Sequence, residues 1–294
     1  MSGDAPSFDA LLLQARSGDA EVVDRAYAAA VGQMRADPRL REVAATAYDR
    51  ARALAGRPQK FGTQAVRAGD RLALWPVEPG TTDTERAKWG LAPLQRLEAR
   101  AEAAALVDKQ ALRRALRRRR KGLTAEERAA AAAQLELRGR AALGVRCAGK
   151  VVAAYWPLVD EVDARPLARA LREDHGARLA LPVVVGEAMD FRAWDDDEGL
   201  VPAGFGTLGP SPAAPLLRPD VVLAPLVGCD RRGGRIGQGK GYYDRALAAL
   251  ARDGEVFTAG VAYGCQVLPV VPTEAHDRAL DAVLTDREWI ALSA

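Results

Sequence analysis

The chain has 294 residues, of which 49% are hydrophobic and 28% are charged, and its formal net charge is +3. This composition is typical of a globular protein with one or two domains, and so small a charge does not by itself indicate a nucleic-acid partner. Three widely spaced cysteines and two histidines exclude a disulfide framework and a multi-histidine metal cluster, and they favour a reducing compartment. With no evident cleavable signal and no run of ~18 apolar residues, we expect a cytoplasmic protein without a membrane span.

The first 120 residues change character twice. Residues 8–55 are predicted to be helical, because Ala, Leu, Arg and Val recur at helical spacing. Residues 56–94 are rich in Gly, Pro and Thr and are predicted to be mostly loop, with a short strand at 71–77. Residues 95–120 form an Ala/Arg/Glu/Leu run, which predicts a helix or a helical linker between the two halves of the chain.

The domain boundary is expected near residues 98–108, where aromatic and turn-forming residues are absent. We therefore predict two domains, each long enough to bury its own core. The first, residues 1–105, is a small and mostly helical domain of unknown function. The second, residues 106–294, has a more regular pattern.

In this second part, strand-like and helical segments alternate. A capping-box signal, Thr124 followed by Glu127, opens a helix that is expected to reach about Leu143. Further helices are predicted at 164–174 and 242–252. Apolar segments predict strands at 151–155, 178–185, 189–194, 221–227, 257–262 and 282–285. Such alternation indicates an α/β domain whose largely parallel sheet has helices on both faces, in three layers.

The segment from Asp230 to Arg245, DRRGGRIGQGKGYYDR, carries the strongest chemical signal. It follows an apolar strand and opens a helix, so its glycines let backbone N–H groups and the helix N-terminus form a phosphate cradle. Lys240 and Arg235 would add positive charge for the phosphates. A plain glycine-rich turn is the alternative interpretation.

The same segment matches the opening of a Walker A motif but departs from it at one position. Gly241 stands where that motif requires Ser or Thr to hold Mg²⁺. A nucleotide site without this hydroxyl needs another metal ligand. Asp244, three residues further on, is the nearest carboxylate and offers the hard oxygen that Mg²⁺ prefers.

The sequence RIGQGKGYYDR (235–245) closely resembles the signature of the 5-formyltetrahydrofolate cyclo-ligase family, the 5,10-methenyltetrahydrofolate synthetases, which usually reads RLGxGxGYYDR. Four other segments resemble the family in the same order, and the resemblance covers about residues 108–290. These segments are 109–128, 153–167, 181–194 and 268–286.

This resemblance implies an ATP- and Mg²⁺-dependent ligase that converts 5-formyltetrahydrofolate to 5,10-methenyltetrahydrofolate, with release of ADP and phosphate. Transfer of the γ-phosphoryl group to the formyl oxygen activates the carbon, N10 attacks it, and phosphate departs. Catalysis of such a transfer consists mainly of positioning and charge neutralisation.

The resemblance also assigns roles to particular residues. Lys240 and Arg235 are the expected catalytic cations. Substrate-binding residues are expected to be Arg113, Trp156 and Glu161, with Glu161 on the pteridine, and the metal ligands Asp244 and Asp277. The ATP-binding set is expected to comprise Lys109, Arg113, Arg235, Ile236, Gly237, Gln238, Gly239, Lys240, Gly241, Tyr242 and Tyr243.

Two departures from the family pattern leave alternatives open. The chain has Gly228-Cys229-Asp230 where the family usually has an aromatic residue, and Gly209 where it usually has Glu before Pro. One alternative is therefore a diverged ligase-like enzyme acting on a related formyl or pyrimidine compound. A less favoured one is a nucleic-acid-binding protein that uses the basic helix 113–121, whose arginines we expect to be mostly solvated. We expect a monomer with a small-molecule substrate, no membrane contact and no nucleic-acid partner.

The N-terminal part resembles a different family. Its phrase KFGTQ (60–64), followed by TERAKWGLAPL (84–94), is similar to an uncharacterised bacterial domain family with a (Tyr/Phe)-Gly-Thr-Gln motif. No activity can be inferred from that resemblance. Thr63 and Gln64 either form a small binding site or belong to a turn that fixes the helices, and both interpretations stay open.

Overall fold

The computed structural model describes residues 6–98, 105–195, 197–204, 206–274 and 277–292. Contacts within the chain divide it into two compact units, which are described separately. The first unit comprises Met1–Arg118 and Leu268–His276, and the second comprises Arg119–Val267 and Asp277–Ala294. The predicted division of the chain into domains at residues 105 and 106 stays a prediction.

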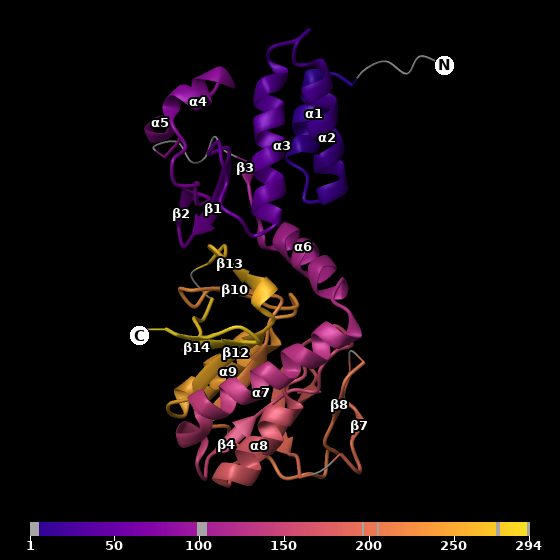
Figure 1. Cartoon of the computed structure of the whole chain (residues 1–294). Coiled ribbons are helices and arrows are strands. Elements are labelled where there is room, and N and C mark those ends of the chain that lie inside the picture. Colours follow the sequence, from indigo (N-terminus) through magenta and orange to yellow (C-terminus); the bar gives the residue numbers. More distant parts are fainter. Residues whose placement is uncertain (1–5, 99–104, 196, 205, 275–276, 293–294) are drawn as a thin grey trace, which may run out of the picture. The chain divides into compact units, whose positions relative to one another are not determined.

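Three helices form the core of the first unit (Figure 1). They are α1 (Phe8–Ala15), α2 (Ala20–Gln33) and α3 (Leu40–Leu54). Their contact faces consist largely of alanine, with Leu11, Val23 and Val43 buried among Ala26, Ala30, Ala44 and Ala47. Small side chains let the helix backbones approach closely, and the helical prediction for residues 8–55 holds apart from the turns between the helices.

A small sheet with two short helices completes the first unit. The sheet has the order β2-β1-β3, and helix α6 runs on from it through the boundary between the units. The bounds are β1 (Gln64–Ala68), β2 (Arg71–Leu74), α4 (Asp83–Lys88), α5 (Leu94–Glu98), β3 (Ala105–Leu106) and α6 (Lys109–Lys121).

The prediction of one helix over residues 95–120 is wrong. Residues 105–106 form strand β3, which pairs in parallel with β1, and the Val107 N–H donates to the Ala65 carbonyl at 2.8 Å. Asp108 then begins α6 by accepting a hydrogen bond from the Ala111 N–H. The pairing with β1 satisfies backbone groups that the alanine-rich sequence would otherwise have satisfied within a helix.

The KFGTQ phrase forms a turn around a buried carboxylate. Asp49 on α3 accepts hydrogen bonds from the N–H groups of Lys60, Phe61 and Thr63 and from the Thr63 hydroxyl, at 2.7–3.0 Å. The Gln64 side chain is buried as well, and its amide donates to the Thr46 carbonyl. These contacts favour the second interpretation of the motif, a turn that fixes a helix.

The second unit contains a seven-stranded sheet of order β15-β14-β12-β9-β4-β5-β6. All neighbouring pairs from β14 to β5 are parallel, and the two edge strands are antiparallel. The bounds are β4 (Val151–Ala153), β5 (Arg178–Val185), β6 (Ala188–Ala193), β9 (Val221–Pro225), β12 (Phe257–Ala262), β14 (Ala282–Thr285) and β15 (Trp289–Ala291).

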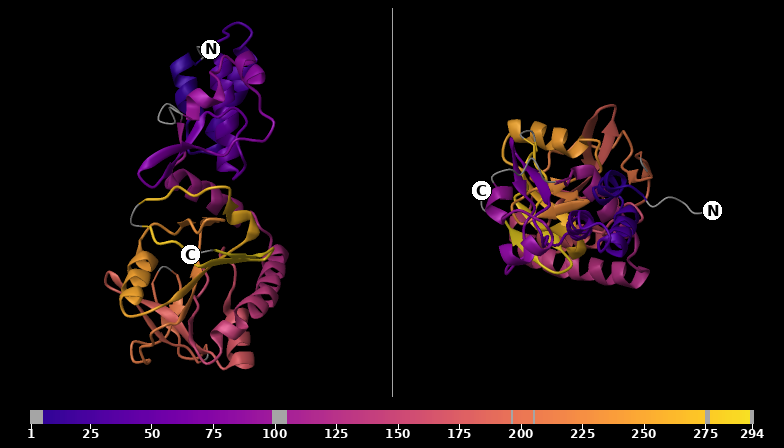
Figure 2. Two further views of the ribbon diagram at one scale, coloured as in Figure 1. Left: turned by 90° about the vertical axis from the view of Figure 1, so that its left-hand side faces the viewer. Right: turned by 90° about the horizontal axis from the view of Figure 1, so that it is seen from above.

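Helices cover both faces of this sheet, as predicted. Helices α7 (Ala125–Cys147) and α8 (Arg165–His175) lie on one face, and α9 (Tyr242–Arg252) lies on the other (Figures 1 and 2). Alternate residues of one strand take part in the two cores: Val221 and Leu223 pack with α7 and α8, whereas Val222 and Ala224 pack with α9. This alternation explains why buried parallel strands read as continuous apolar runs.

Shorter elements complete the second unit. A hairpin of β10 and β11 precedes α9, and a two-stranded sheet of β7 and β8 follows β6. Their bounds are β7 (Val201–Pro202), β8 (Leu208–Gly209), β10 (Gly228–Asp230) and β11 (Arg235–Ile236), with a 3-10 turn at Gly264–Gln266 and β13 at Val267–Leu268. Within the described ranges, no helix is both long and apolar enough to cross a membrane.

The capping box at the start of α7 is a testable element of this fold. The Thr124 hydroxyl accepts a hydrogen bond from the Glu127 N–H, and the Glu127 carboxylate accepts one from the Thr124 N–H. Because an N-cap of this kind stabilises a helix, Thr124→Ala is expected to lower the free energy of unfolding by about 1 kcal/mol. Thr124→Ser retains the cap, so its free energy of unfolding should stay within a few tenths of a kcal/mol of the wild-type value. Equal losses in the two variants, measured by urea unfolding, would contradict this prediction.

Candidate functional site

The glycine-rich loop begins with the β10–β11 hairpin. The Asp230 carboxylate accepts hydrogen bonds from the N–H groups of Arg232 and Gly234, both at 2.9 Å, and so stabilises the turn. Gly233 has a φ of +88°, and a Cβ there would lie 3.1 Å from the Leu280 carbonyl. This position therefore requires glycine both for its backbone angle and for the close approach of the chain.

The loop ends where α9 begins. Gly241 precedes the helix with a φ of +70°, and α9 starts at Tyr242 as predicted. Lys240 is exposed, and its carbonyl accepts a hydrogen bond from Arg245 at 3.2 Å. A flexible cation beside a helix N-terminus is an arrangement suited to binding an anion.

Arg235 is the buried cation of the loop. Its side chain is 6% exposed and forms an ion pair with Asp244 in the first turn of α9, whose side chain is 41% exposed. The other terminal nitrogen of Arg235, Nη1, is buried and has no hydrogen-bond partner among the described residues. The structure thus brings together two residues that the sequence assigned to phosphate and metal binding, and it leaves Arg235 an unused donor.

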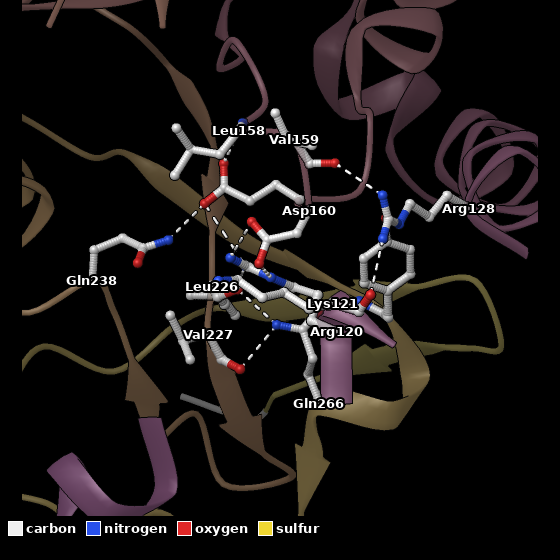
Figure 3. Close-up of polar contacts among 12 residues, drawn as sticks. Arg120, Lys121, Arg128, Leu158, Val159, Asp160, Leu226, Val227, Gln238 and Gln266 are labelled. Atoms are coloured by element: carbon white, nitrogen blue, oxygen red, sulfur yellow. Dashed lines mark hydrogen bonds and ion pairs between the residues drawn. The ribbon is translucent and has the colours of Figure 1, made fainter. Parts of the chain in front are cut away.

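Gln238 connects the loop to Glu161. Its amide donates to Glu161 Oε1 at 2.8 Å, and the Leu158 N–H donates to Oε2 at 3.0 Å (Figure 3). The Glu161 side chain is 5% exposed. A residue predicted to bind phosphates and one predicted to bind the pteridine are therefore in direct contact.

Arg120 is the centre of this cluster, although the sequence did not single it out. Its guanidinium group, 2% exposed, forms two hydrogen bonds with the Asp160 carboxylate at 2.9 and 3.0 Å (Figure 3). It donates a third to the Leu226 carbonyl, and Nη1 lies 3.8 Å from Glu161. Gln266 donates to the carbonyls of Leu226 and Val227 and so holds the strand end that Arg120 contacts.

The expectation that the arginines of the basic helix are mostly solvated is wrong for Arg120. It belongs to an unbroken run of four arginines, 117–120. It follows Leu116 by four residues and Leu112 by eight, and both leucines are buried, so Arg120 lies on the apolar face of α6. Arg118, by contrast, is half exposed. Two sequence signals could have indicated this burial: the helical spacing from Leu112 and Leu116, and the acidic pair at 160–161 within a family segment.

Burial determines the ionisation of several groups in the site. It raises the pKa of the Glu161 carboxyl group, and the Leu158 N–H, Arg120 and Gln238 partly oppose this effect. Burial also raises the pKa of the phenols of Tyr243 and Tyr155, which therefore stay protonated. The Tyr155 hydroxyl donates to the Val162 carbonyl, whereas the buried Tyr243 hydroxyl has no partner among the described residues.

Trp156 lies at the end of β4, as expected, but one face of its ring is already covered. The Arg165 guanidinium group lies 4.3 Å from the ring centroid. Asp163 holds Arg165 in this place through two hydrogen bonds, at 2.7 and 2.9 Å. A substrate ring that stacks on Trp156 must use the other face or displace Arg165.

The predicted metal ligands are separate in the chain. Asp244 opens α9, and Asp277 is half-buried in the segment that leads into β14. Among the described residues, no group of three or more His, Cys, Asp or Glu side chains could hold a metal ion. This is compatible with Mg²⁺, which usually takes one or two carboxylates and completes its shell with phosphate oxygens and water.

Lys109 and Arg113 belong to the first unit, on α6. Lys109 Nζ lies 4.0 Å from the Glu274 carboxylate, and burial lowers the pKa of Arg113. Because the loop belongs to the second unit, the predicted approach of these two side chains to the phosphates stays a prediction.

A cavity of about 690 Å³ lies beside strands β5 to β8. Its lining is mostly aliphatic and comprises Val183, Val184, Val185, Arg192, Val201, Pro202, Ala203, Gly204, Pro210 and Pro212. Arg192 is the charged member of the lining, and it donates to the carbonyls of Pro212 and Ala214. Such a cavity suits a ligand with an apolar body and an acidic end.

The two departures from the family pattern lie in tightly packed positions. A Cβ at Gly209 would lie 2.9 Å from the Ala203 Cβ, so a larger residue would require the wall of the cavity to shift. Cys229 is completely buried in β10, and burial raises the pKa of its thiol to about 12. The Cys229 thiol is therefore a packing group and not a nucleophile.

The fold and the site define an α/β protein in which a glycine-rich loop with exposed and buried cations contacts a buried carboxylate. The family model for the 5-formyltetrahydrofolate cyclo-ligase family matches residues 105–286. The chain belongs to this family of enzymes.

Individual relatives agree with that assignment. The 5-formyltetrahydrofolate cyclo-ligase of Mycolicibacterium smegmatis is 35% identical over half of this chain and 79% of its own length. That of Escherichia coli is 32% identical over 59% of this chain and its own full length. The 5,10-methenyltetrahydrofolate synthetase of Aquifex aeolicus superimposes with a TM-score of 0.54 and 28% identity, covering 63% of this chain and 93% of that one.

Replacing Glu161 with Gln is expected to remove a pH-dependent part of the stability. Because its pKa is raised, folded Glu161 holds its proton more tightly than the unfolded chain does. This contribution to the free energy of unfolding is fully present at pH values below 4.5, the ordinary pKa of a Glu carboxyl group. It is lost as the pH rises through the pKa of Glu161 in the folded protein. The difference in free energy of unfolding between wild type and Glu161→Gln, measured in urea, should therefore change with pH above 4.5. A difference that stays constant with pH would refute this prediction.

Proposed function

We propose that this protein converts 5-formyltetrahydrofolate to 5,10-methenyltetrahydrofolate and hydrolyses ATP to ADP and phosphate. The observation that carries the proposal is the 2.8 Å hydrogen bond between Gln238 and Glu161. It joins the loop that has the features of a phosphate cradle to the carboxylate assigned to the pteridine. A reaction that moves a phosphoryl group onto the folate needs both ligands at such a meeting point.

The loop residues would act on the transferred phosphoryl group. In the proposed reaction the γ-phosphoryl group moves to the formyl oxygen, N10 attacks the carbon and loses its proton, and the carbon–oxygen bond breaks to release phosphate. Lys240 and the unused Nη1 of Arg235 would neutralise the negative charge of the phosphates. Asp244 and Asp277 would hold Mg²⁺, which would supply further positive charge against the phosphates.

Glu161 and the cavity would hold the folate. A buried carboxylate can accept two hydrogen bonds from the 2-amino and ring N–H groups of a pteridine, and Arg120 and Gln238 orient it. Trp156 would contact the pterin ring. The aliphatic cavity suits the benzoyl part of the folate, and Arg192 in its wall suits a glutamyl carboxylate.

The alternatives receive less support. Arg120 of the basic helix is committed to Asp160 and is not available to a polyanion, which weakens the nucleic-acid interpretation. A diverged substrate would have to fit the same cavity, whose lining residue Ala203 packs against Gly209. We also propose a monomer with domains at 1–105 and 106–294. A cytoplasmic location is proposed because Cys147 and Cys229 are free thiols, as expected in a reducing compartment.

The decisive experiment is spectroscopic. Purified protein is mixed with 5-formyltetrahydrofolate, ATP and Mg²⁺, and the absorbance of the methenyl product is followed while ADP is measured in parallel. Product formation that requires ATP supports the proposal. ATP-independent product, or no product with this folate, would overturn it, and turnover of another formyl compound would favour a diverged enzyme.

Lys240→Ala and Asp244→Asn should each lower kcat by a factor of about 10² or more. Removing one preorganised charge that stabilises a transition state has effects of this size. The exposed Lys150→Ala, in the turn before β4, is the matched control and should keep wild-type turnover. Unchanged turnover in Asp244→Asn would refute the metal assignment.

Gln238→Ala should weaken folate binding. Loss of a hydrogen bond to a charged group in a buried site typically changes binding about ten-fold, so KM for the folate should rise by that factor. Gln134→Ala, at an exposed position of α7, serves as the control. An unchanged KM for the folate, measured at saturating ATP, would show that the contact between Gln238 and Glu161 is not part of the working site.

A further inference from the structure

One edge of strand β1 binds two segments that are far apart in the chain. The Val107 N–H donates to the Ala65 carbonyl at 2.8 Å, and the Thr273 N–H donates to the Arg67 carbonyl at 3.1 Å. The Gly69 N–H also donates to the Thr273 hydroxyl at 3.2 Å. Carbonyls two residues apart in a strand point to the same edge, so β3 and Thr273 lie one after the other along it, while β2 occupies the opposite edge.

Both bound segments lead directly to residues of the proposed site. Leu106 at the end of β3 is three residues before Lys109, and Thr273 is four residues before Asp277. The two segments also meet through side chains, because Lys109 Nζ lies 4.0 Å from Glu274. All of these contacts lie within the first unit, which takes residues 268–276 from the family-matched part of the chain.

The KFGTQ turn holds β1 in its place. Gln64 opens the strand with a fully buried side chain, and Asp49 anchors the turn before it by accepting hydrogen bonds from four donor groups. Arg50, 2% exposed, donates to the Leu106 carbonyl at 2.8 Å and lies within hydrogen-bonding distance of Gln64 Oε1. The N-terminal motif is therefore connected, through buried polar contacts, to the end of β3.

We propose that the N-terminal part of the first unit fixes the backbone of two segments that lead, along the chain, to proposed nucleotide and metal ligands. Strand β1 acts as a clamp that binds β3 and Thr273, so that Lys109 and Asp277 are each held within three or four residues of an anchored backbone. Gln64 and Thr273 are positioning residues in this account. The inference rests on the proposed function, since it takes Lys109 and Asp277 to act on ATP and Mg²⁺.

The test breaks the clamp at Thr273 in the full-length protein. Thr273→Val removes the hydroxyl that Gly69 binds, and Thr273→Pro also removes the N–H that Arg67 binds. KM for ATP should rise a few-fold in the first variant and about ten-fold in the second, with KM for the folate unchanged. Thr84→Val, at an exposed position of α4, is the matched control.

Hydrogen exchange separates this inference from the proposed function. Amide exchange in residues 277–285 should be faster in Thr273→Pro than in the wild type, whatever the substrate of the enzyme is. Wild-type protein that makes no methenyl product would overturn the proposed function alone. A Thr273→Pro variant with wild-type KM for ATP and wild-type exchange would overturn the clamp alone.

A disulfide provides a second test that does not depend on the proline variant folding. Ala68 and Thr273 are bridge partners, and partners on neighbouring strands have the spacing that a disulfide needs. In Ala68→Cys/Thr273→Cys, the oxidised protein should have the same kcat and the same KM values for ATP and the folate as the reduced protein, because the disulfide fixes the pairing of β1 with Thr273 that the active enzyme already has. Loss of turnover on oxidation, restored by a reductant, would show that the clamp must open and would overturn the proposal.

Discussion

The candidate site depends on the burial of one positive charge. The Arg120 guanidinium group is 2% exposed, and a buried charge is tolerated only when its hydrogen bonds and its counter-charge are in place. Asp160 and the Leu226 carbonyl meet this requirement. Since Glu161 follows Asp160 in the chain, the same contact brings the Glu161 carboxylate to the place where Gln238 reaches it. The meeting of loop and carboxylate is thus a consequence of how one arginine is neutralised.

Much of the second unit could be predicted because its elements depend on local pattern. Helix α9 and strands β5, β12 and β14 have the predicted bounds, since each is a short apolar or amphipathic run between strong turn signals. The helix predicted over 95–120 failed, because pairing of β3 with β1 is a long-range contact that alanine content cannot reveal. Residues 235–245 carry the closest resemblance to the cyclo-ligase family, whose family model matches residues 105–286.

The site was only partly predictable, for a physical reason. Motif residues such as Arg235 and Asp244 lie near one another in the chain, so their ion pair follows from one turn of helix after a loop. Arg120 is different: helical spacing places it on the face of Leu112 and Leu116, but the sequence does not reveal that Asp160, 40 residues away, neutralises it there. The contact of the Arg165 guanidinium group with the Trp156 ring likewise depends on Asp163, which holds Arg165 by hydrogen bonds.

The order of the two units along the chain has a consequence for biosynthesis. The first unit includes residues 268–276, and most of the second unit, Arg119–Val267, lies between the two parts of the first in the sequence. During translation the helices α1 to α3 emerge first, but strand β1 gains its pairing with Thr273 only when nearly the whole polypeptide has left the ribosome. A chain that stops before Thr273 lacks the partner of the Arg67 carbonyl and the Gly69 N–H. Such an unpaired strand edge is a template for pairing with other chains.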